Sequence, residues 1–216
     1  MRVTDCDVMG GESTPCEHAS LPETGRGDWR TGLPTLVASR CKLREVALAD
    51  APSLLAHLNT AEVAKFIPPP PASVEAFEDF VRWAHVRRQQ GRYACFGIVP
   101  AGGRTAVGVF QIHVAEDNAD VAGWGFAMGQ AYWGSGIFPA GADQIREFAF
   151  RRMGVQRLEA RSAVQNGRGN GALRKIGATP AGVLKAGFDE PHDLRFDMAR
   201  WVLTGEDQAP AASASG

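Results

Sequence analysis

The most constraining feature of this chain is residues 124–139, WGFAMGQAYWGSGIFP, where a strand-like run ends, a glycine-containing loop follows and an amphipathic helix begins. The first turn of a helix leaves backbone N–H groups unpaired, and the helix dipole adds positive potential there. Gly134 and Gly136 let the backbone approach an anion closely and adopt positive φ. Pro139 suits the first turn because it lacks an N–H. The segment therefore predicts either a phosphate-binding loop or a plain strand-to-helix turn, and spacing alone does not decide between them.

Two common nucleotide-binding signatures do not fit this loop. Gly134-Ser135-Gly136 is followed by Ile-Phe-Pro rather than by x-x-Gly, so the dinucleotide fingerprint is incomplete. The chain contains no Gly-Lys-Ser/Thr, which excludes an ordinary P-loop.

Downstream, residues 151–175 hold seven Arg or Lys residues and one Glu. This stretch indicates either a solvated face or a seat for a polyanionic ligand beside the loop.

Residue periodicity predicts the elements around the loop. We expect an edge-type strand at 41–46, a helix starting near Asp50 and a helix over 73–90. Pro68 to Pro71 form a break that cannot be helix or central strand. Further strands are expected at 92–99, 105–114, 121–128, 157–164, 183–188 and 194–203, with helices after the loop and over 167–176.

This order of elements predicts an α+β fold, with a mixed, mostly antiparallel sheet flanked by helices. We expect one folded domain at 36–205. A Gly/Pro/Ser-rich extension at 1–35 and an Ala/Ser-rich tail at 206–216 are expected to be disordered.

Composition excludes several classes of protein. A net charge of -1 gives no reason to expect nucleic acid or an anionic membrane as partner. No apolar stretch is long enough to span a membrane, and the N-terminus lacks the apolar core of a signal peptide. Four scattered cysteines without a C-x-x-C pair predict neither a disulfide framework nor a metal site, and Cys95 is expected to be a core residue. We therefore expect a cytoplasmic protein without a bound metal.

Four stretches, in this order, resemble the GNAT N-acetyltransferases, and in particular the RimJ/RimL-like branch that includes ribosomal-protein N-terminal acetyltransferases. They cover roughly residues 36–203. They are Leu43-Arg44-Glu45 with Asp50-Ala51, the loop from Ala131 to Gly136, the strand from Arg157 to Arg161, and Asn166 followed by Leu173-x-Lys175-x-Gly177.

The resemblance implies a splayed sheet with acetyl-CoA as co-substrate between the fourth and fifth strands. The pantetheine arm would pair with the backbone of Phe126, Ala127 and Met128, as an added strand does. Backbone amides would hold the pyrophosphate, and these belong to Gly134, Ser135, Gly136, Ile137 and Phe138. Asn166 would contact the coenzyme arm, although a helix N-cap role alone would explain it. The basic residues nearest to the ribose phosphate would be Arg168 and then Lys175.

Two glycines depart from the family pattern. Gly169 stands where the family has Ser three residues after the Asn, and Gly123 stands where the fourth strand often carries an acid. Coenzyme binding is expected to survive these changes, whereas a side-chain acid–base mechanism does not transfer.

The chemistry implied is direct attack of an amine on the thioester, which requires a proton acceptor. The first polar candidates for this acceptor are His113, Glu116 and Tyr132. Further candidates are Asp117, Asp120 and Glu159. Each has a structural alternative: solvent exposure for His113, turn formation for the hairpin acids, ion pairing for Glu159 and packing for Tyr132. The sequence favours none of them.

The expected function is transfer of an acetyl group from acetyl-CoA to a primary amine, on a protein N-terminus or a small molecule. An alternative is a non-catalytic acyl-CoA-binding or sensing module on the same fold, motivated by Gly169 and Gly123. A third is a nucleotide-binding regulatory domain of another fold. The acceptor pocket is expected near 64–73 and 187–193, and the oligomeric state stays open, a homodimer included.

Overall fold

The structure is a computed structural model that describes residues 28–115, 118–186 and 196–205. In these ranges the chain forms an eight-stranded sheet in the order β1-β2-β3-β4-β5-β6-β8-β7. Every neighbouring pair is antiparallel except β5 and β6. The strands are β1 Leu36–Val37, β2 Cys41–Glu45, β3 Tyr93–Pro100, β4 Gly108–Val114, β5 Val121–Met128, β6 Arg157–Ala163, β7 Thr179–Leu184 and β8 Met198–Thr204. The predicted α+β class with a mostly antiparallel mixed sheet is confirmed.

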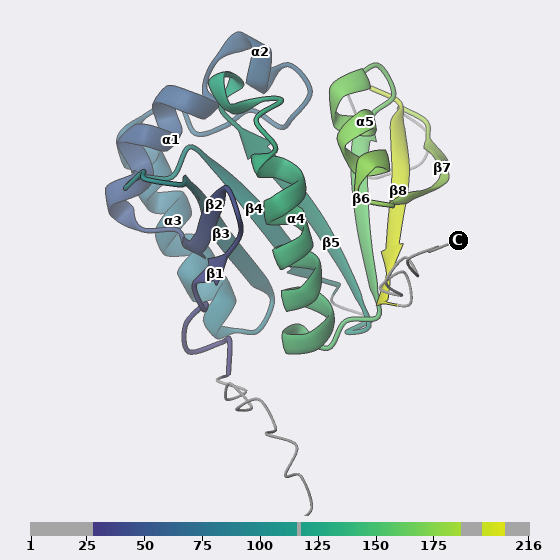
Figure 1. Ribbon diagram of the computed structural model, residues 1–216, viewed down its shortest axis with the longest axis horizontal. Coiled ribbons are helices and arrows are strands. Elements are labelled where there is room, and N and C mark those ends of the chain that lie inside the picture. Colours follow the sequence, from purple (N-terminus) through teal and green to yellow (C-terminus); the bar gives the residue numbers. More distant parts are fainter. Residues whose placement is uncertain (1–27, 116–117, 187–195, 206–216) are drawn as a thin grey trace, which may run out of the picture.

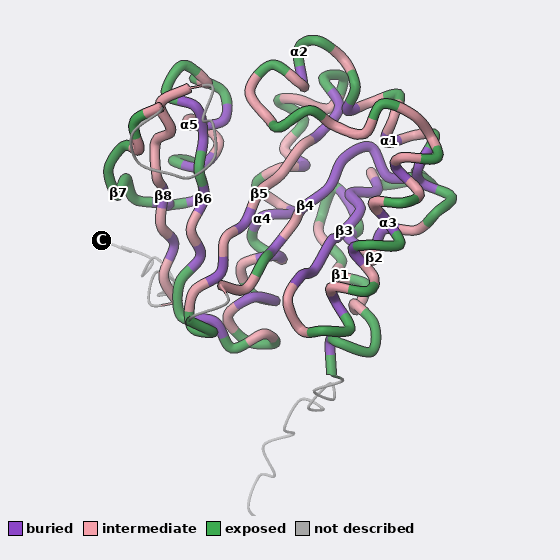
Figure 2. Tube along the Cα trace, turned by 180° about the vertical axis from the view of Figure 1, so that it is seen from behind, coloured by how far each residue is buried: buried purple, intermediate pink, exposed green. Residues whose placement is uncertain are grey.

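Helices cover both faces of this sheet (Figures 1 and 2). The α-helices are α1 Ala51–Leu58, α2 Ala61–Ala64, α3 Val74–Gln89, α4 Ile137–Glu147 and α5 Gly167–Lys175. Alternation along β3 serves two cores, because successive side chains point to opposite faces. Tyr93 and Cys95 pack with α1 and α3, whereas Phe96 and Ile98 pack with α4.

The sheet splays between β5 and β6. These strands pair only where Val121–Gly123 lie beside Arg157–Glu159. Beyond those residues the strands separate, as Figure 1 shows. The remaining part of β5, residues 124–128, therefore pairs with β4 on one side and has no strand partner on the other. This is the splayed sheet that the resemblance implies, and it creates the opening in which the candidate site lies.

Local signals account for the helix boundaries near this opening. Ser73 caps α3 by accepting a hydrogen bond from the Ala76 N–H at 3.1 Å, as its position before the helix predicts. Gly177, with φ of 83°, follows the end of α5. A π-helical turn, Phe148–Met153, extends α4 and ends at Gly154, which also has positive φ.

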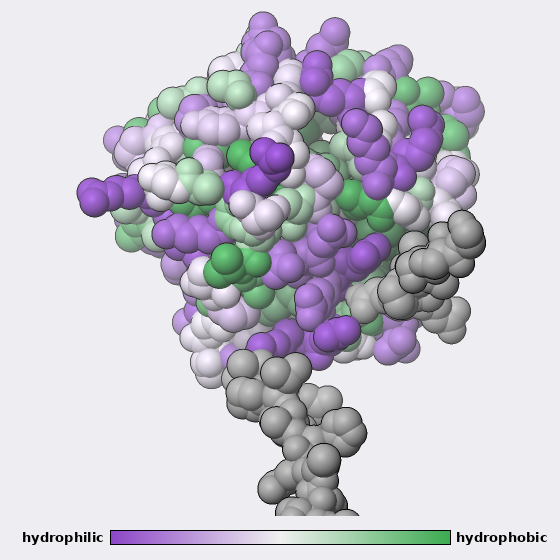
Figure 3. Space-filling view, in the orientation of Figure 1, coloured by the Kyte–Doolittle hydropathy of each residue, from purple (hydrophilic) through white to green (hydrophobic). Residues whose placement is uncertain are grey.

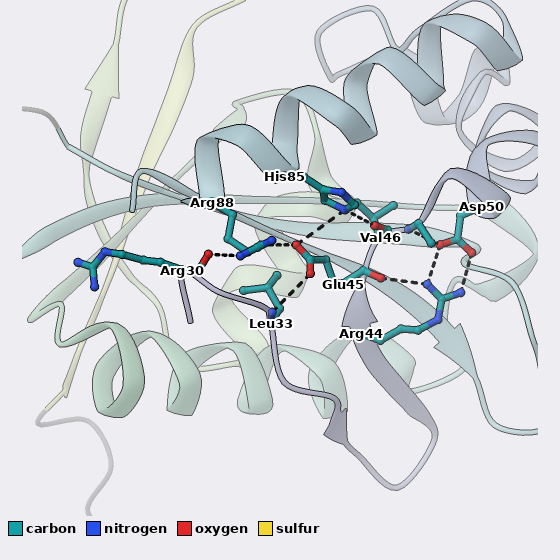
Figure 4. A network of polar contacts seen from close by, with 9 residues as sticks. Arg30, Leu33, Arg44, Glu45, Val46, Asp50, His85 and Arg88 are labelled. Carbon is teal, nitrogen blue, oxygen red and sulfur yellow. Dashed lines mark hydrogen bonds and ion pairs between the residues drawn. The ribbon is translucent and has the colours of Figure 1, made fainter. Parts of the chain in front are cut away.

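The N-terminal part of the fold differs from expectation. Trp29 is buried in the core on the α4 face, so ordered packing begins upstream of the predicted boundary at residue 36. Figure 4 shows how this segment is held: Arg88 of α3 contacts Glu45 and donates to the Arg30 carbonyl, and Glu45 also accepts from the Leu33 N–H at 3.5 Å. The short β1 covers β2, so β2 is not the edge strand that the sequence predicts. β7 also begins earlier than expected, at Thr179.

Asp50 links β2 to the turn after β3. Its side chain is 1% exposed and accepts from both Arg44 Nη atoms at 2.7 Å. The N–H groups of Ala47 and Ala106 donate to it at 2.9 Å each. Burial opposes ionisation of this carboxyl, but the bonds from Arg44 and the two amides outweigh it and hold the pKa of Asp50 below its ordinary value.

Candidate active site

Two cavities meet in the opening between β5 and β6. Their volumes are about 410 Å³ and about 500 Å³. Six residues line both: Phe66, Ile67, Phe126, Ala127, Asn166 and Gly169. The cavities therefore adjoin, and we call the place where these residues lie the junction. The space-filling view in Figure 3 shows the surface hollowed between α2 and α5, with apolar atoms inside the hollow.

The first cavity lies along the free part of β5, the glycine loop and the first turn of α5. Seven of the ten residues that the resemblance implies for coenzyme binding line it: Phe126, Ala127, Met128, Gly134, Phe138, Asn166 and Arg168. Ser135, Gly136 and Ile137 are not among its lining residues and form the remainder of the adjacent loop and helix start. Residues implied from several distant motifs are thus brought to one cavity.

The loop before α4 has a fixed shape. Gly134 and Gly136 have φ of 75° and 81°, which residues with a Cβ adopt only with strain. Ser135 Oγ donates to the Tyr132 carbonyl at 2.6 Å and accepts from the Ile137 N–H at 3.4 Å. Trp133 Nε1 donates to the Met128 carbonyl at 2.8 Å and ties the loop to the end of β5. The start of α4 is therefore held beside the first cavity.

Two arginines lie against this loop. The Arg168 guanidinium is 4.2 Å from the centre of the Trp133 ring. The Arg40 side chain, from the turn between β1 and β2, lies 3.0 Å from where a Cβ on Gly136 would stand. Sequence reasoning pointed to Arg168 and missed Arg40, because nothing in the sequence connects that turn to a loop so far along the chain. Lys175 is in the last turn of α5, at the opposite end of the helix from Arg168.

Asn166 has the structural role that its position predicts. Its Oδ1 accepts from the Gly169 N–H at 2.9 Å and caps α5. It also lines both cavities. Capping fixes the orientation of its amide at the junction, so the two roles are compatible.

The second cavity is mainly apolar. Its walls include Phe77 and Phe80 of α3, Val109 of β4 and the Pro68–Pro71 segment. The expected contribution of residues 64–73 is thus present as Phe66 to Pro71, whereas the range 187–193 lies outside the described residues. Polar side chains come from Gln111, Arg161, Ser162 and Asn166. No carboxylate is among the described residues that line this cavity.

The candidate proton acceptors lie elsewhere or outside the described ranges. Glu116 and Asp117 lie outside the described residues. His113 is exposed, as its structural alternative predicts, and one side of its ring packs on Gly123. Partial desolvation of the ring and, after it, the positive charge of Arg161 lower the pKa of His113. Tyr132 contacts His57 edge-on at 5.4 Å between ring centres. Neither His113 nor Tyr132 lines either of these two cavities, and the ring contact supports the packing alternative for Tyr132.

The remaining two acids have structural contacts. Glu159 pairs with Arg157 at 2.9 Å and with Arg200 at 3.3 Å, as its basic surroundings predict. Asp120 is exposed, and its backbone carbonyl accepts from the Gln156 and Arg157 N–H groups. Neither residue lines either of these two cavities.

Sequence reasoning missed Ser162. It lies on β6, is 6% exposed and lines the second cavity beside the junction. A lone serine in a strand carries no sequence signal, because only its place in the fold distinguishes it from other polar strand residues.

The described residues contain neither a metal-binding group of side chains nor a membrane-spanning helix. No group of three or more His, Cys, Asp or Glu side chains there is arranged to hold a metal ion. No helix in the same ranges is long and apolar enough to cross a membrane.

Residues 40–179 match the acetyltransferase (GNAT) domain family. The uncharacterized N-acetyltransferase p20 of Bacillus licheniformis is 22% identical over 135 residues, which are 62% of this chain and 76% of that protein. RimJ of Mycobacterium smegmatis, solved in complex with CoA-disulfide, superposes with a TM-score of 0.71 at 20% identity, covering 81% of this chain and 89% of that one. The ribosomal-protein-S5-alanine acetyltransferase of Vibrio fischeri gives 0.70 at 14% identity, covering 82% and 100%.

Proposed function

The chain belongs to the GNAT acetyltransferase family, and from that membership we propose that its two cavities hold acetyl-CoA and an amine acceptor on either side of the junction. Members of this family transfer an acetyl group to an amine, and this chain is such an enzyme. The assignment of each cavity to a substrate is our proposal.

The free edge of β5 is the observation that carries this assignment. Residues 124–128 have no strand partner on the side of the opening, and Phe126, Ala127 and Met128 line the first cavity. An arm with amide groups can pair with such an edge as a peptide strand does. The same cavity reaches the loop at the start of α4, so one elongated ligand with amides and phosphates would contact both. Acetyl-CoA has this chemistry.

The phosphate end would lie at the loop from Gly134 to Phe138. N–H groups in the first turn of α4 offer hydrogen bonds, and the helix dipole favours an anion there. Arg168 and Arg40 add two positive charges beside the loop. Backbone amides and cations together favour a pyrophosphate over a single carboxylate.

The acceptor would enter the second cavity. Its apolar walls favour an amine on an apolar body, such as an apolar N-terminal residue or a small hydrophobic amine. This cavity also supports turnover over the alternative of a sensing module, since binding acetyl-CoA alone would need only the first cavity.

At the junction the amine nitrogen would attack the thioester carbonyl carbon. A C–N bond forms and the C–S bond breaks, the nitrogen loses one proton, and CoA leaves as a thiol after gaining one. Positioning of the two substrates supplies much of the rate enhancement. A β5 N–H group facing the opening would stabilise the negative charge on the carbonyl oxygen.

Calorimetry on the full chain tests this proposal. We expect acetyl-CoA to bind with micromolar affinity, and NAD and ATP at least tenfold more weakly. Gly134→Glu should abolish binding, because it places a side chain and a negative charge where the loop would bind the phosphates. Gly102→Glu is the matched control, because Gly102 also has positive φ (78°) but lines neither cavity. Absence of acetyl-CoA binding by folded protein would refute the assignment, whereas binding justifies a turnover screen of amines and peptides.

A further inference from the structure

A row of three residues crosses the sheet where the second cavity lies. Gln111 of β4 is directly opposite Gly125 of β5. Gly123 and Glu159 form the last pair between the parallel strands β5 and β6. Gly125 and Arg161 are each two residues further along, so they share the next row and the same face of the sheet. Gln111, Gly125 and Arg161 all line the second cavity.

The glycine in the middle of this row leaves open space above the sheet. A Cβ on Gly125 would meet no other atom within 4 Å. The neighbouring Gly123 differs, because the His113 ring occupies the corresponding space there. A group of the acceptor could therefore lie above Gly125, between the polar side chains of Gln111 and Arg161.

The charge that faces this space is positive. Arg161 is exposed, and, after desolvation, its charge is the second cause of the lowered pKa of His113, so the guanidinium lies near that ring on the same face. Glu159, two residues before Arg161 on β6, is paired with Arg157 and Arg200. Since no described residue lining the second cavity carries a carboxylate, this space suits an anion better than a cation.

We propose that Arg161 and Gln111 bind a carboxylate of the acceptor above Gly125, so that the enzyme prefers amines that carry such a group. This inference rests on the proposed function. A guanidinium can donate two parallel hydrogen bonds to a carboxylate, and a glutamine amide adds a further donor. The amine would react at the junction beside Ala127, which is two residues from Gly125 along β5. That spacing places the carboxylate about 7 Å from the amine nitrogen.

Two sources of this chemistry have the required separation. One is a small amine whose carboxylate lies at the far end of an apolar body. The other is a peptide with an apolar first residue and an acidic second residue. The α-carboxylate of a free amino acid does not qualify, because a single carbon atom separates it from the nitrogen.

Matched pairs of acceptors test the preference in the full chain. The small-molecule pair is 4-(aminomethyl)benzoate and 4-(aminomethyl)benzamide. The peptide pair is Ala-Asp-Ala-Ala and Ala-Asn-Ala-Ala, both with amidated C-termini. We expect kcat/KM to be about 3- to 10-fold higher for the carboxylate in at least one pair, with a smaller ratio at high salt. The pair that shows the preference identifies the source.

Two variants separate this contact from the chemistry of the acceptors. Arg161→Gln removes the charge and Gly125→Val fills the space, so each should reduce the carboxylate-to-amide ratio at least threefold. Neither residue lines the first cavity, so the affinity for acetyl-CoA in calorimetry should stay within about twofold of the wild type. Arg157→Gln is the matched control, because Arg157 lies on the same strand, pairs with Glu159 and lines neither cavity. It should keep the preference.

A charge reversal gives a gain that general damage to the protein cannot produce. Arg161→Glu should favour Ala-Lys-Ala-Ala over Ala-Asp-Ala-Ala, the opposite of the wild type. Equal ratios in the wild type and Arg161→Gln for both pairs, or the same loss in Arg157→Gln, would overturn the role of Arg161. Use of neither pair by a chain that binds acetyl-CoA would also overturn it and leave the coenzyme site in place. Failure of the wild type to bind acetyl-CoA would overturn the proposed function and this inference with it.

Discussion

At the scale of single residues, the two glycines that depart from the family pattern each leave room for another side chain. A Cβ on Gly123 would overlap the His113 ring, which lies directly across from it on β4. A Cβ on Gly169 would crowd Ser162 and Asn166. Sequence comparison presents both glycines as missing functional groups, whereas the structure shows that neighbouring side chains use the space.

The Gly123 contact predicts a stability difference between two strand glycines. Gly123→Ala should lower the free energy of unfolding by about 0.5–1.5 kcal/mol, because the exposed His113 ring would have to leave its present rotamer. Gly125→Ala is the matched control, because its Cβ would meet nothing within 4 Å. Urea denaturation measures both. Adding His113→Ala should restore most of the loss in Gly123→Ala, and failure to do so would show that the His113 ring is not the obstacle.

Asp50 predicts a pH-dependent contribution to stability. Asp50→Asn should lower the free energy of unfolding at pH 7 by about 3 kcal/mol, because Arg44 loses its buried partner. The folded-state pKa of Asp50 is lowered, so the stabilisation is complete above the ordinary carboxyl pKa and is lost as pH falls through the folded value.

Urea denaturation of the wild type and Asp50→Asn between pH 7 and pH 3 measures this contribution. The difference between the two proteins should shrink at the acid end. The control is Asp79→Asn, whose carboxyl is 79% exposed and pairs with Arg82 on the surface, and it should change stability by less than about 0.5 kcal/mol. A difference that grows towards low pH would contradict the assignment.

At the scale of elements, the start of α4 is the part that the sequence describes best. Glycine spacing and periodicity predict the loop and the helix, and the loop glycines do adopt positive φ. The α3 cap and the end of α5 are predictable for the same reason, since each depends on residues close in sequence. The packing of Trp29 and the contact of Arg40 with the loop are not predictable, because they join segments far apart along the chain.

The opening itself was expected only through the family resemblance. Periodicity gives β5 and β6 as strands but does not say that they pair over three residues and then separate. Ser162 illustrates the limit further, because its burial beside Gly169 comes from the packing of α5 on β6 and from no local pattern. Local pattern predicts elements, whereas the site depends on how they are placed.

The two arginines that lie against the glycine loop, Arg40 and Arg168, predict how the affinity for the coenzyme depends on charge and salt. Arg40→Ala and Arg168→Ala should each weaken acetyl-CoA binding about 3- to 10-fold, with a weaker dependence of affinity on salt than in the wild type. Lys175→Ala serves as control and should bind within twofold of the wild type, since Lys175 is at the far end of α5. Calorimetry at two salt concentrations provides the data. Equal loss in all three variants would point to a general charge effect.

At the scale of the whole molecule, two buried thiols report on the integrity of both cores. Cys41 lies in the core on the α4 face and Cys95 in the core beneath α1 and α3. Burial raises the pKa of both thiols, so neither forms the reactive thiolate near neutral pH. We expect a thiol reagent to label Cys41 and Cys95 only as fast as the chain unfolds.

Mass spectrometry of peptides after timed labelling measures each cysteine separately. Cys41 and Cys95 should react at the same slow rate in native buffer and rapidly in denaturant. Faster labelling of one of them in native buffer would show that its core opens independently of the other.

The presence of two adjoining cavities has a kinetic consequence. Arg168, Trp133 and Phe138 line only the first cavity, whereas Phe77, Phe80 and Val109 line only the second. With acetyl-CoA in the first cavity and the amine in the second, as proposed, the two substrates would occupy different places and could be bound together. Catalysis would then proceed through a ternary complex, and no acetylated form of the enzyme would have to be stored between two half-reactions.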